Sequence, residues 1–319
     1  MGSRRNLIVA LGTLSCSVPV EPQMSHVDVR RYYDAFGERE WQRLENPADG
    51  AVEFAVTCHA LATHLPVAGR VLDIGGGPGR YALWPAECGY RVALADLSPT
   101  LLAIAREQVR RSPGRTHVAE IVEADACDLS RWADDTFDAV LALGPFYHLP
   151  DPSDRERAAT ELHRVLRPGG VAFVALMPRY AFLRRTIAIP DEPHRMADPA
   201  FVQRVMDDGV FINDVPGRFT GGYGVRPKEV VPFFERHGFV TRTLLACEGM
   251  VPDLQGVLVQ MQQEDPVAFH RTLAMIVQSA ADPSILGMSA HLLYIASKGQ
   301  PEVDLTDHHP GNSMTARAR

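Results

Sequence analysis

The residues best suited to bind a ligand lie in the segment VLDIGGGPGR, at positions 71–80. An acid, Asp73, stands two positions before the first glycine, Gly75, and Gly77 and Gly79 follow at alternate positions. A strand that leads into such a turn and then into a helix brings backbone N–H groups close to a ligand, and glycines leave no side chain to block the approach. The segment therefore predicts a nucleotide-type cofactor site at the first βα turn of an open α/β sheet.

A second acid stands where nucleotide-binding folds usually hold a ribose. Asp96 ends the apolar run that begins at Arg91, at about the 20-residue spacing from the glycine turn that such folds show. Ser98 and Pro99 already supply the N-cap and first residue of the next helix, which leaves the Asp96 carboxylate free for ribose hydroxyls.

The dinucleotide fingerprint G-x-G-x-x-G fails here, because Arg80 stands where its third glycine is required. The pattern D-x-G-x-G-x-G instead resembles motif I of the class I S-adenosylmethionine-dependent methyltransferases. Two later segments strengthen the resemblance. GPFYHL at 144–149 resembles the corresponding segment of family members that methylate small molecules, and VLRPGG at 165–170 stands just before a predicted strand, as in the family. Together these pieces cover about residues 66–177 in the family's order and spacing.

The resemblance implies S-adenosylmethionine as methyl donor and S-adenosylhomocysteine as product. Asp96 would then hold the ribose, and Leu97 would flank the adenine. Asp125 would accept a hydrogen bond from the adenine amine, a role that suits a carboxylate because it only accepts, and the backbone of Ala126 would reach a ring nitrogen. The remaining expected cofactor contacts lie in motif I, in the loop after the fourth strand and on the N-terminal helix: Asp73, Gly75, Gly76, Gly77, Gly79, Arg80, Gly144 and Tyr33.

The loop after the predicted strand at 137–143 holds the catalytic candidates. His148 is a candidate general base for a hydroxyl or amine acceptor, because an imidazole titrates near neutral pH. Tyr147 is the second catalytic candidate, and Phe146 is expected to contact the substrate. A hydrogen-bonded structural histidine explains His148 equally well, and a carboxylate acceptor would need no base.

Further substrate contacts are expected in the region after the fifth strand. Arg179 begins a group of basic residues that could receive a carboxylate or diphosphate, although a solvated surface is the plain alternative. Tyr223 and Arg226, in FTGGYGVRP, are the other predicted substrate residues.

The amino-acid composition limits the kinds of molecule that this chain is expected to bind. The 319-residue chain carries a net charge of −7, which argues against a nucleic-acid partner. No apolar run is long enough to predict a membrane span. The five cysteines are scattered and no metal-binding spacing is present, which predicts reduced thiols, a cytoplasmic protein and no metal. A small-molecule acceptor is the expected partner, and a homodimer is compatible with the sequence.

These elements predict an α/β fold: a Rossmann-like sheet of seven strands, mostly parallel with an antiparallel last strand, helices on both faces and helical cap inserts. The expected organisation is a disordered or mis-assigned extension upstream of Met24 (1–24), lid helices (25–65), the cofactor-binding core (66–177), a cap insert (178–226), the end of the core with a second helical insert (227–298), and a disordered tail (299–319).

The sequence therefore predicts a methyltransferase that acts on O, N or C of a small molecule, with secondary metabolism as the expected setting. A peptide or protein carboxylate is the alternative acceptor. A non-catalytic protein that binds S-adenosylmethionine is a second alternative. A nicotinamide oxidoreductase is a third, disfavoured by Arg80.

Overall fold

A single mixed sheet forms the frame of the molecule. The computed structural model describes residues 25–44, 48–213, 219, 221–252 and 254–299, so the expected extension and nearly all of the expected tail lie outside the described residues. Five strands pair in parallel, in the order β3 (Val118–Glu123), β2 (Arg91–Asp96), β1 (Arg70–Ile74), β4 (Phe137–Ala142) and β5 (Leu166–Pro178). The chain order reverses between β1 and β4, and ligands bind open α/β sheets at such switch points.

The far side of β5 completes the predicted seven-stranded core. β9 (Leu292–Lys298) pairs antiparallel with β5, and β8 (Phe239–Ala246) pairs antiparallel with β9. The inner strands are buried along nearly their whole length, as expected where helices cover both faces of a sheet. The prediction of a mostly parallel sheet with an antiparallel last strand is confirmed.

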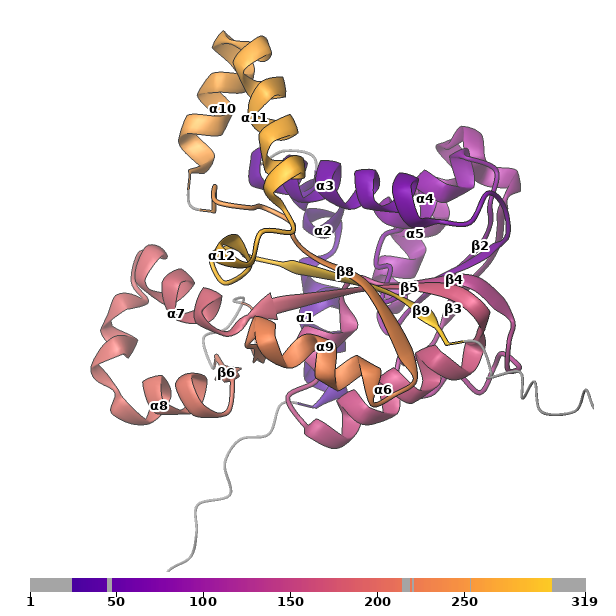
Figure 1. Cartoon of the computed structure of the whole chain (residues 1–319), viewed down its shortest axis with the longest axis horizontal. Coiled ribbons are helices and arrows are strands. Elements are labelled where there is room, and N and C mark those ends of the chain that lie inside the picture. The colour runs from indigo at the N-terminus through magenta and orange to yellow at the C-terminus, as the bar shows by residue number, and fades with distance from the viewer. Residues whose placement is uncertain (1–24, 45–47, 214–218, 220, 253, 300–319) are drawn as a thin grey trace, which may run out of the picture.

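Helices cover both faces of this sheet (Figure 1). One face packs against α3 (Ala48–His64), α4 (Arg80–Glu87) and α5 (Pro99–Arg111), and the other packs against α6 (Pro152–Val165) and α9 (Pro227–Glu235). The N-terminal helices α1 (His26–Phe36) and α2 (Glu38–Arg43) lie near the middle of the molecule, and a hairpin of α10 (Gln255–Glu264) and α11 (Pro266–Ser279) projects from it. Short helices complete the description: η1 (Pro113–Thr116), η2 (Pro145–His148), η3 (Pro193–Ala197) and α12 (Pro283–Leu286). Within the described ranges, no helix combines the length and the apolar character needed to cross a membrane.

The cap is not purely helical, contrary to the sequence prediction. Besides α7 (Arg179–Ala188) and α8 (Pro199–Asp207) it contains two strands, β6 (Val210–Ile212) and β7 (Gly221–Val225). β7 pairs in parallel with the end of β5, where Met177 faces Gly224. Glycine has low strand propensity, so the run GGYGV carried no strand signal; tertiary pairing overrides that propensity here.

Arg179 connects α8, β7 and α9 through hydrogen bonds, and it lines neither of the two cavities described below. Its side chain is buried, and its guanidinium donates to the carbonyls of Asp207 (2.7 Å), Gly224 (3.1 Å) and Met206 (3.2 Å) and pairs with Glu229 (3.3 Å). These groups come from the end of α8, from β7 and from α9. The predicted substrate role of Arg179 does not fit this position.

Replacing Arg179 should therefore destabilise the protein. We expect Arg179→Ala to lower the free energy of unfolding by about 3–5 kcal/mol, because it leaves buried carbonyls and a carboxylate without their partner. Arg185→Ala, on the same helix but exposed, should cost less than about 1 kcal/mol. Urea denaturation of both variants measures this, and equal effects would contradict the structural role.

Candidate functional site

A cavity of about 100 Å³ lies at the carboxyl ends of β1, β2 and β4. Its walls are the glycine turn, the loops after β2, β3 and β4, and the N-terminal helices α1 and α2. Many of the residues that the sequence singled out line it: Tyr33, Asp73, Gly75, Gly76, Gly77, Arg80, Asp96, Leu97, Asp125, Ala126, Gly144, Tyr147 and His148. Sequence analysis missed His26, Glu40 and Arg43, which line it from α1 and α2.

The glycine turn contributes space more than hydrogen-bond donors. The N–H groups of Gly75 and Gly76 donate to the carbonyl of Ala95, and that of Gly77 donates to Asp96. A Cβ on Gly76 would lie 2.3 Å from Leu94 Cδ1, and Gly77 has φ +54°, which disfavours any other residue. These three N–H groups are therefore bonded within the protein, and the turn requires glycine for close packing at Gly76 and for backbone conformation at Gly77.

Asp96 is the best-placed polar group of the cavity. One carboxylate oxygen accepts the N–H of Gly77 and the other accepts that of Ser98, both at 2.8 Å. Burial raises the pKa of Asp96 to about 6, against the opposing effect of these two hydrogen bonds. Each oxygen keeps a second lone pair, so the carboxylate can still accept hydrogen bonds from a pair of hydroxyls.

Asp73 is a buried acid without a protein partner. Its side chain is fully buried, and neither carboxyl oxygen has a hydrogen-bond partner among the described residues. Burial, together with the nearby charge of Asp96, raises the pKa of Asp73 to about 8. An unpaired buried carboxyl is costly, and in a cavity wall it marks where a cationic ligand group would be received.

The N-terminal helix α1 is tied to the acid predicted to bind adenine. His26 Nδ1 lies 2.5 Å from Asp125 Oδ2, and His26 Nε2 lies 3.2 Å from Asp154 Oδ2. The other oxygen of Asp125 accepts the N–H of Cys127 at 2.8 Å. The hydrogen bond to Asp125 is the main cause that raises the pKa of His26 above its ordinary 6.5.

A second tie joins α1 to His148. The hydroxyl of Tyr33 lies 2.8 Å from His148 Nε2. Burial lowers the pKa of His148 to about 3, so the imidazole is neutral, and burial raises the pKa of Tyr33 well above 10. The other ring nitrogen of His148, Nδ1, is buried in the cavity wall without a hydrogen-bond partner among the described residues, so the role of His148 as general base stays a prediction. Tyr147, whose pKa burial also raises, donates to the carbonyl of Leu143 at 3.2 Å.

Four other predicted site residues do not line the cavity. Phe146 is buried in the core against Phe234, with 5.4 Å between ring centroids. The ring of Tyr223 lies under the guanidinium of Arg155, 3.6 Å from its centroid. Arg226 precedes α9 and pairs with Glu229, and Gly79 is the N-cap of α4. The substrate roles predicted for Phe146, Tyr223 and Arg226 do not fit these positions. The sequence shows that these residues are aromatic or basic, but it does not show which distant residues they contact.

The fold also brings together potential metal ligands that sequence spacing did not predict. Two groups have ligand atoms within 4.8 Å of one another: His26, Cys127 and Asp154, and Glu53, Glu248 and His291. In both groups the histidine already bonds a carboxylate, and Arg43 donates to Glu53 at 2.7 Å. We assign neither group as a metal site.

Comparisons with known proteins concern this same core. Residues 72–174 match the family model described as a methyltransferase domain. Methyltransferase GfsG of Streptomyces halstedii is 40% identical over 107 residues, which are 33% of this chain and 37% of that protein. A ubiquinone biosynthesis O-methyltransferase of Xanthomonas oryzae is 32% identical over 151 residues, which are 47% of this chain and 57% of that protein. The chain thus spans about half or less of the length of these relatives.

A solved structure shows the same fold over most of the chain. A SAM-dependent methyltransferase from Methanosarcina mazei aligns with 76% of this chain and 98% of its own, with a TM-score of 0.53 and 19% sequence identity. This similarity extends beyond residues 72–174 and confirms the Rossmann-like fold.

The contact between His26 and Asp125 predicts that helix α1 is held less firmly as pH rises. The pKa of His26 is raised in the folded state, so its charged contact with Asp125 is complete below about pH 6.5 and is lost as pH rises through the raised pKa. Hydrogen-exchange protection factors of residues 26–36 should therefore fall with rising pH, once corrected for intrinsic exchange. His26→Gln should remove this dependence, while α9 serves as internal control. An unchanged pH dependence in His26→Gln would contradict this role.

Proposed function

We propose that this chain, whose residues 72–174 match a methyltransferase domain, is a class I S-adenosylmethionine-dependent methyltransferase that transfers a methyl group from this cofactor to a small-molecule acceptor. One observation carries the proposal: motif I, Asp96 and Asp125, predicted separately from the sequence, line one cavity at the switch point of the sheet.

The cavity suits each part of the cofactor. The unpartnered carboxyl of Asp73 would receive the ammonium of the amino-acid end, and Asp96 would accept from the ribose hydroxyls. Asp125 and the backbone of Ala126 would bind the adenine, with Leu97 beside it. Ligand cavities usually enclose about 300–1,000 Å³, so a cavity of about 100 Å³ has to widen, and α1 and α2 are the elements placed to move.

When bound, S-adenosylmethionine supplies a methyl group that is electrophilic because it is attached to a positively charged sulfur. The protein's part is to orient the acceptor, exclude water and take up the proton that a hydroxyl or amine loses. Orientation alone can supply about 7–11 kcal/mol of the activation barrier.

The size of a second cavity and the relatives' names both support a small acceptor. A cavity of about 540 Å³ lies beneath α7, within the range usual for small-molecule ligands of about 300–1,000 Å³. One relative's name places it in ubiquinone biosynthesis, as an O-methyltransferase.

A setting in secondary metabolism, a homodimer and a cytoplasmic location belong to the proposal. The described cysteines, Cys58, Cys88, Cys127 and Cys247, are all free thiols, which suits a reducing compartment.

Methyl transfer can be tested without knowing the acceptor. The full chain is incubated with S-adenosylmethionine carrying a deuterated methyl group and with an extract of the source organism, and the products are analysed by mass spectrometry. We expect the label in a small molecule. Label confined to peptides or proteins would favour the alternative acceptor, and no label together with tight cofactor binding would favour a non-catalytic role.

Asp73 predicts that cofactor binding releases a proton. At pH 7 a carboxyl with a pKa of about 8 is mostly protonated, and a cationic group bound beside it would ionise it. Calorimetry with S-adenosylhomocysteine in buffers of different ionisation enthalpy should show about one proton more released by the wild type than by Asp73→Asn. Equal proton release by the two proteins would show that Asp73 does not face the cofactor's ammonium.

A further inference from the structure

The second cavity lies beside the first, at the carboxyl ends of β5 and β8. Its apolar walls come from Met177 at the end of β5, from Ala181 and Ala188 on α7, and from the following Ile189. Arg43 on α2 lines both cavities, so they adjoin at this side chain. A ligand in the second cavity would therefore lie next to the cofactor site, with the side chain of Arg43 between them.

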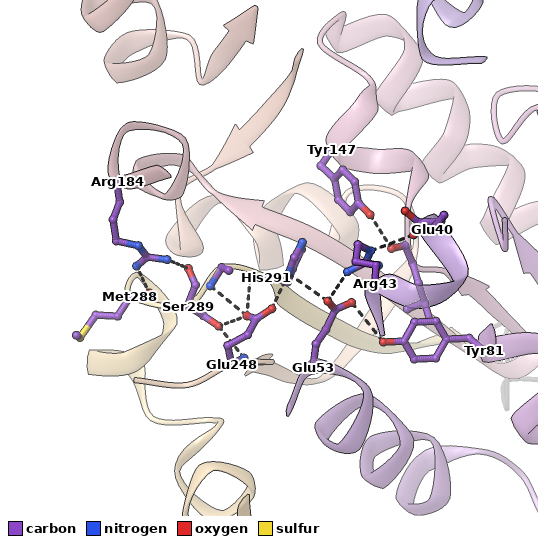
Figure 2. Close-up of polar contacts among 12 residues, drawn as sticks. Glu40, Arg43, Glu53, Tyr81, Tyr147, Arg184, Glu248, Met288, Ser289 and His291 are labelled. Atoms are coloured by element: carbon purple, nitrogen blue, oxygen red, sulfur yellow. Dashed lines mark hydrogen bonds and ion pairs between the residues drawn. The ribbon is translucent and has the colours of Figure 1, made fainter. Parts of the chain in front are cut away.

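A chain of charged groups leads from the lining of the first cavity to that of the second (Figure 2). Arg43 pairs with Glu40 at 3.0 Å and with Glu53 at 2.7 Å, and Glu53 Oε2 lies 3.8 Å from His291 Nδ1. His291 Nδ1 in turn lies 2.6 Å from Glu248 Oε1. The residues come from α2, from α3, from the loop after β8 and from the start of β9, so only the folded chain assembles them.

Glu248 fixes the orientation of His291. Its other oxygen, Oε2, accepts hydrogen bonds from the N–H of His291 (2.7 Å), the N–H of Ala290 (3.1 Å) and the hydroxyl of Ser289 (2.8 Å). The side chain of Glu248 is 3% exposed, so the carboxylate cannot turn away to solvent. With Nδ1 donating to this carboxylate, the lone pair of the neutral imidazole is on Nε2.

Nε2 of His291 is available to a ligand. His291 lines the second cavity, and no described residue is hydrogen-bonded to its Nε2. His148 lines the first cavity instead, its Nε2 is bonded to Tyr33, and no carboxylate is hydrogen-bonded to its Nδ1 among the described residues. A carboxylate on Nδ1 and an open Nε2 form the arrangement by which an imidazole acts as general base.

The charges around His291 favour proton uptake. Burial works to lower its pKa, but the carboxylates of Glu248 and Glu53 outweigh burial and raise the pKa above 6.5. Arg43 opposes this rise, and Tyr147 faces the ring at 5.9 Å between centroids without carrying a charge near neutral pH. Glu53 is itself a poor proton acceptor: burial raises its pKa, but Arg43 and His291 outweigh burial and hold the pKa below its usual range.

We propose that the second cavity binds the methyl acceptor and that His291, positioned by Glu248, is the base that takes the acceptor's hydroxyl proton. The proposal rests on the proposed function. The O–H bond breaks and its proton passes to Nε2, while an oxygen electron pair forms the new C–O bond. The C–S bond breaks with its electron pair retained by sulfur, so the products are a methyl ether, neutral S-adenosylhomocysteine and an imidazolium that returns its proton to water.

The walls define the acceptor class. An apolar part of the acceptor fits the surfaces of Met177, Ala181, Ala188 and Ile189, and its ionisable hydroxyl, phenolic or enolic, would face His291. Arg184 and Arg185 on α7 also line the cavity, so a further polar or anionic group on the acceptor is compatible with it. Such hydroxyls are acidic enough for an imidazole to accept their proton, whereas a carboxylate acceptor has no proton to lose and would not use Nε2.

The state of His291 can be measured without any acceptor. In the full chain with ring ¹⁵N-labelled histidine, bound to S-adenosylhomocysteine, we expect His291 to titrate above pH 6.5 with Nδ1 carrying the proton in the neutral form. His291→Asn identifies the signal. A neutral form protonated at Nε2, or a ring that does not titrate, would overturn the proposal.

Turnover tests the role directly. With the acceptor supplied by the extract and with saturating cofactor, His291→Asn, which keeps a donor for Glu248, should lower the rate of methyl transfer by about 10²–10⁴-fold. Its affinity for S-adenosylhomocysteine, measured by calorimetry, should stay within about threefold of wild type. His59→Asn, an exposed change on α3, is the matched control and should leave both unchanged.

The pH profile separates catalysis from a merely structural role. The wild-type rate should rise with pH through a midpoint above 6.5, and Glu248→Gln should move that midpoint down by about one unit or more. Wild-type rates in His291→Asn, or an unshifted midpoint in Glu248→Gln, would overturn the proposal. No transfer by the wild type, with normal cofactor binding, would be a failure of the proposed function, and the role of His291 as base would fall with it.

Discussion

The site depends first on the carboxylate of Asp96. It lies at the end of β2, is 8% exposed, and accepts one N–H from the glycine turn after β1 and one from the start of α5. These two bonds hold neighbouring βα turns in one geometry, so the turn of Gly77 cannot move without breaking a charge-assisted bond worth about 1.5–3 kcal/mol. The same oxygens keep lone pairs directed to the cavity. The cost of burying this carboxylate is therefore offset at a position where it both holds the glycine turn in place and lines the cavity.

A partly buried chain of ion pairs and hydrogen bonds from Glu40 to Glu248 connects the cofactor cavity to the rest of the molecule. Buried ion pairs contribute little net stability, because desolvation offsets their attraction, but removing one partner is strongly destabilising. Here the chain connects helix α2 to the residue that precedes β9, through Arg43, Glu53 and His291. A lid that moves to admit a cofactor would move Arg43, which both cavities share, and would change the charge beside His291. Closure over the cofactor and preparation of the acceptor site are thus physically linked in the proposed mechanism.

Local sequence signals predicted much of the fold and the wall of the cofactor cavity. Motif I and the pair of Ser98 and Pro99 are each a pattern of a few residues, and Asp96 follows motif I at the spacing typical of nucleotide-binding folds. The structure has the expected strand before motif I and the expected helix cap at Ser98. Contacts between residues that are far apart in the sequence could not be predicted in this way. Arg179 was grouped with other basic residues as a substrate contact, because its charge is visible in the sequence but its carbonyl partners are not. Glu53, Glu248 and His291 lie far apart in the chain and carry no shared motif, so only packing reveals them.

Calorimetric titration of the full chain with S-adenosylhomocysteine, and separately with NAD, tests the central claim most directly. The account predicts saturable binding of S-adenosylhomocysteine at one site per chain and none of NAD. Asp96→Ala should weaken that binding by roughly 100-fold or more, since two hydrogen bonds to a charged group are lost. Saturable binding of NAD without S-adenosylhomocysteine, or wild-type affinity in Asp96→Ala, would contradict the assignment of the glycine turn and Asp96 as the cofactor site.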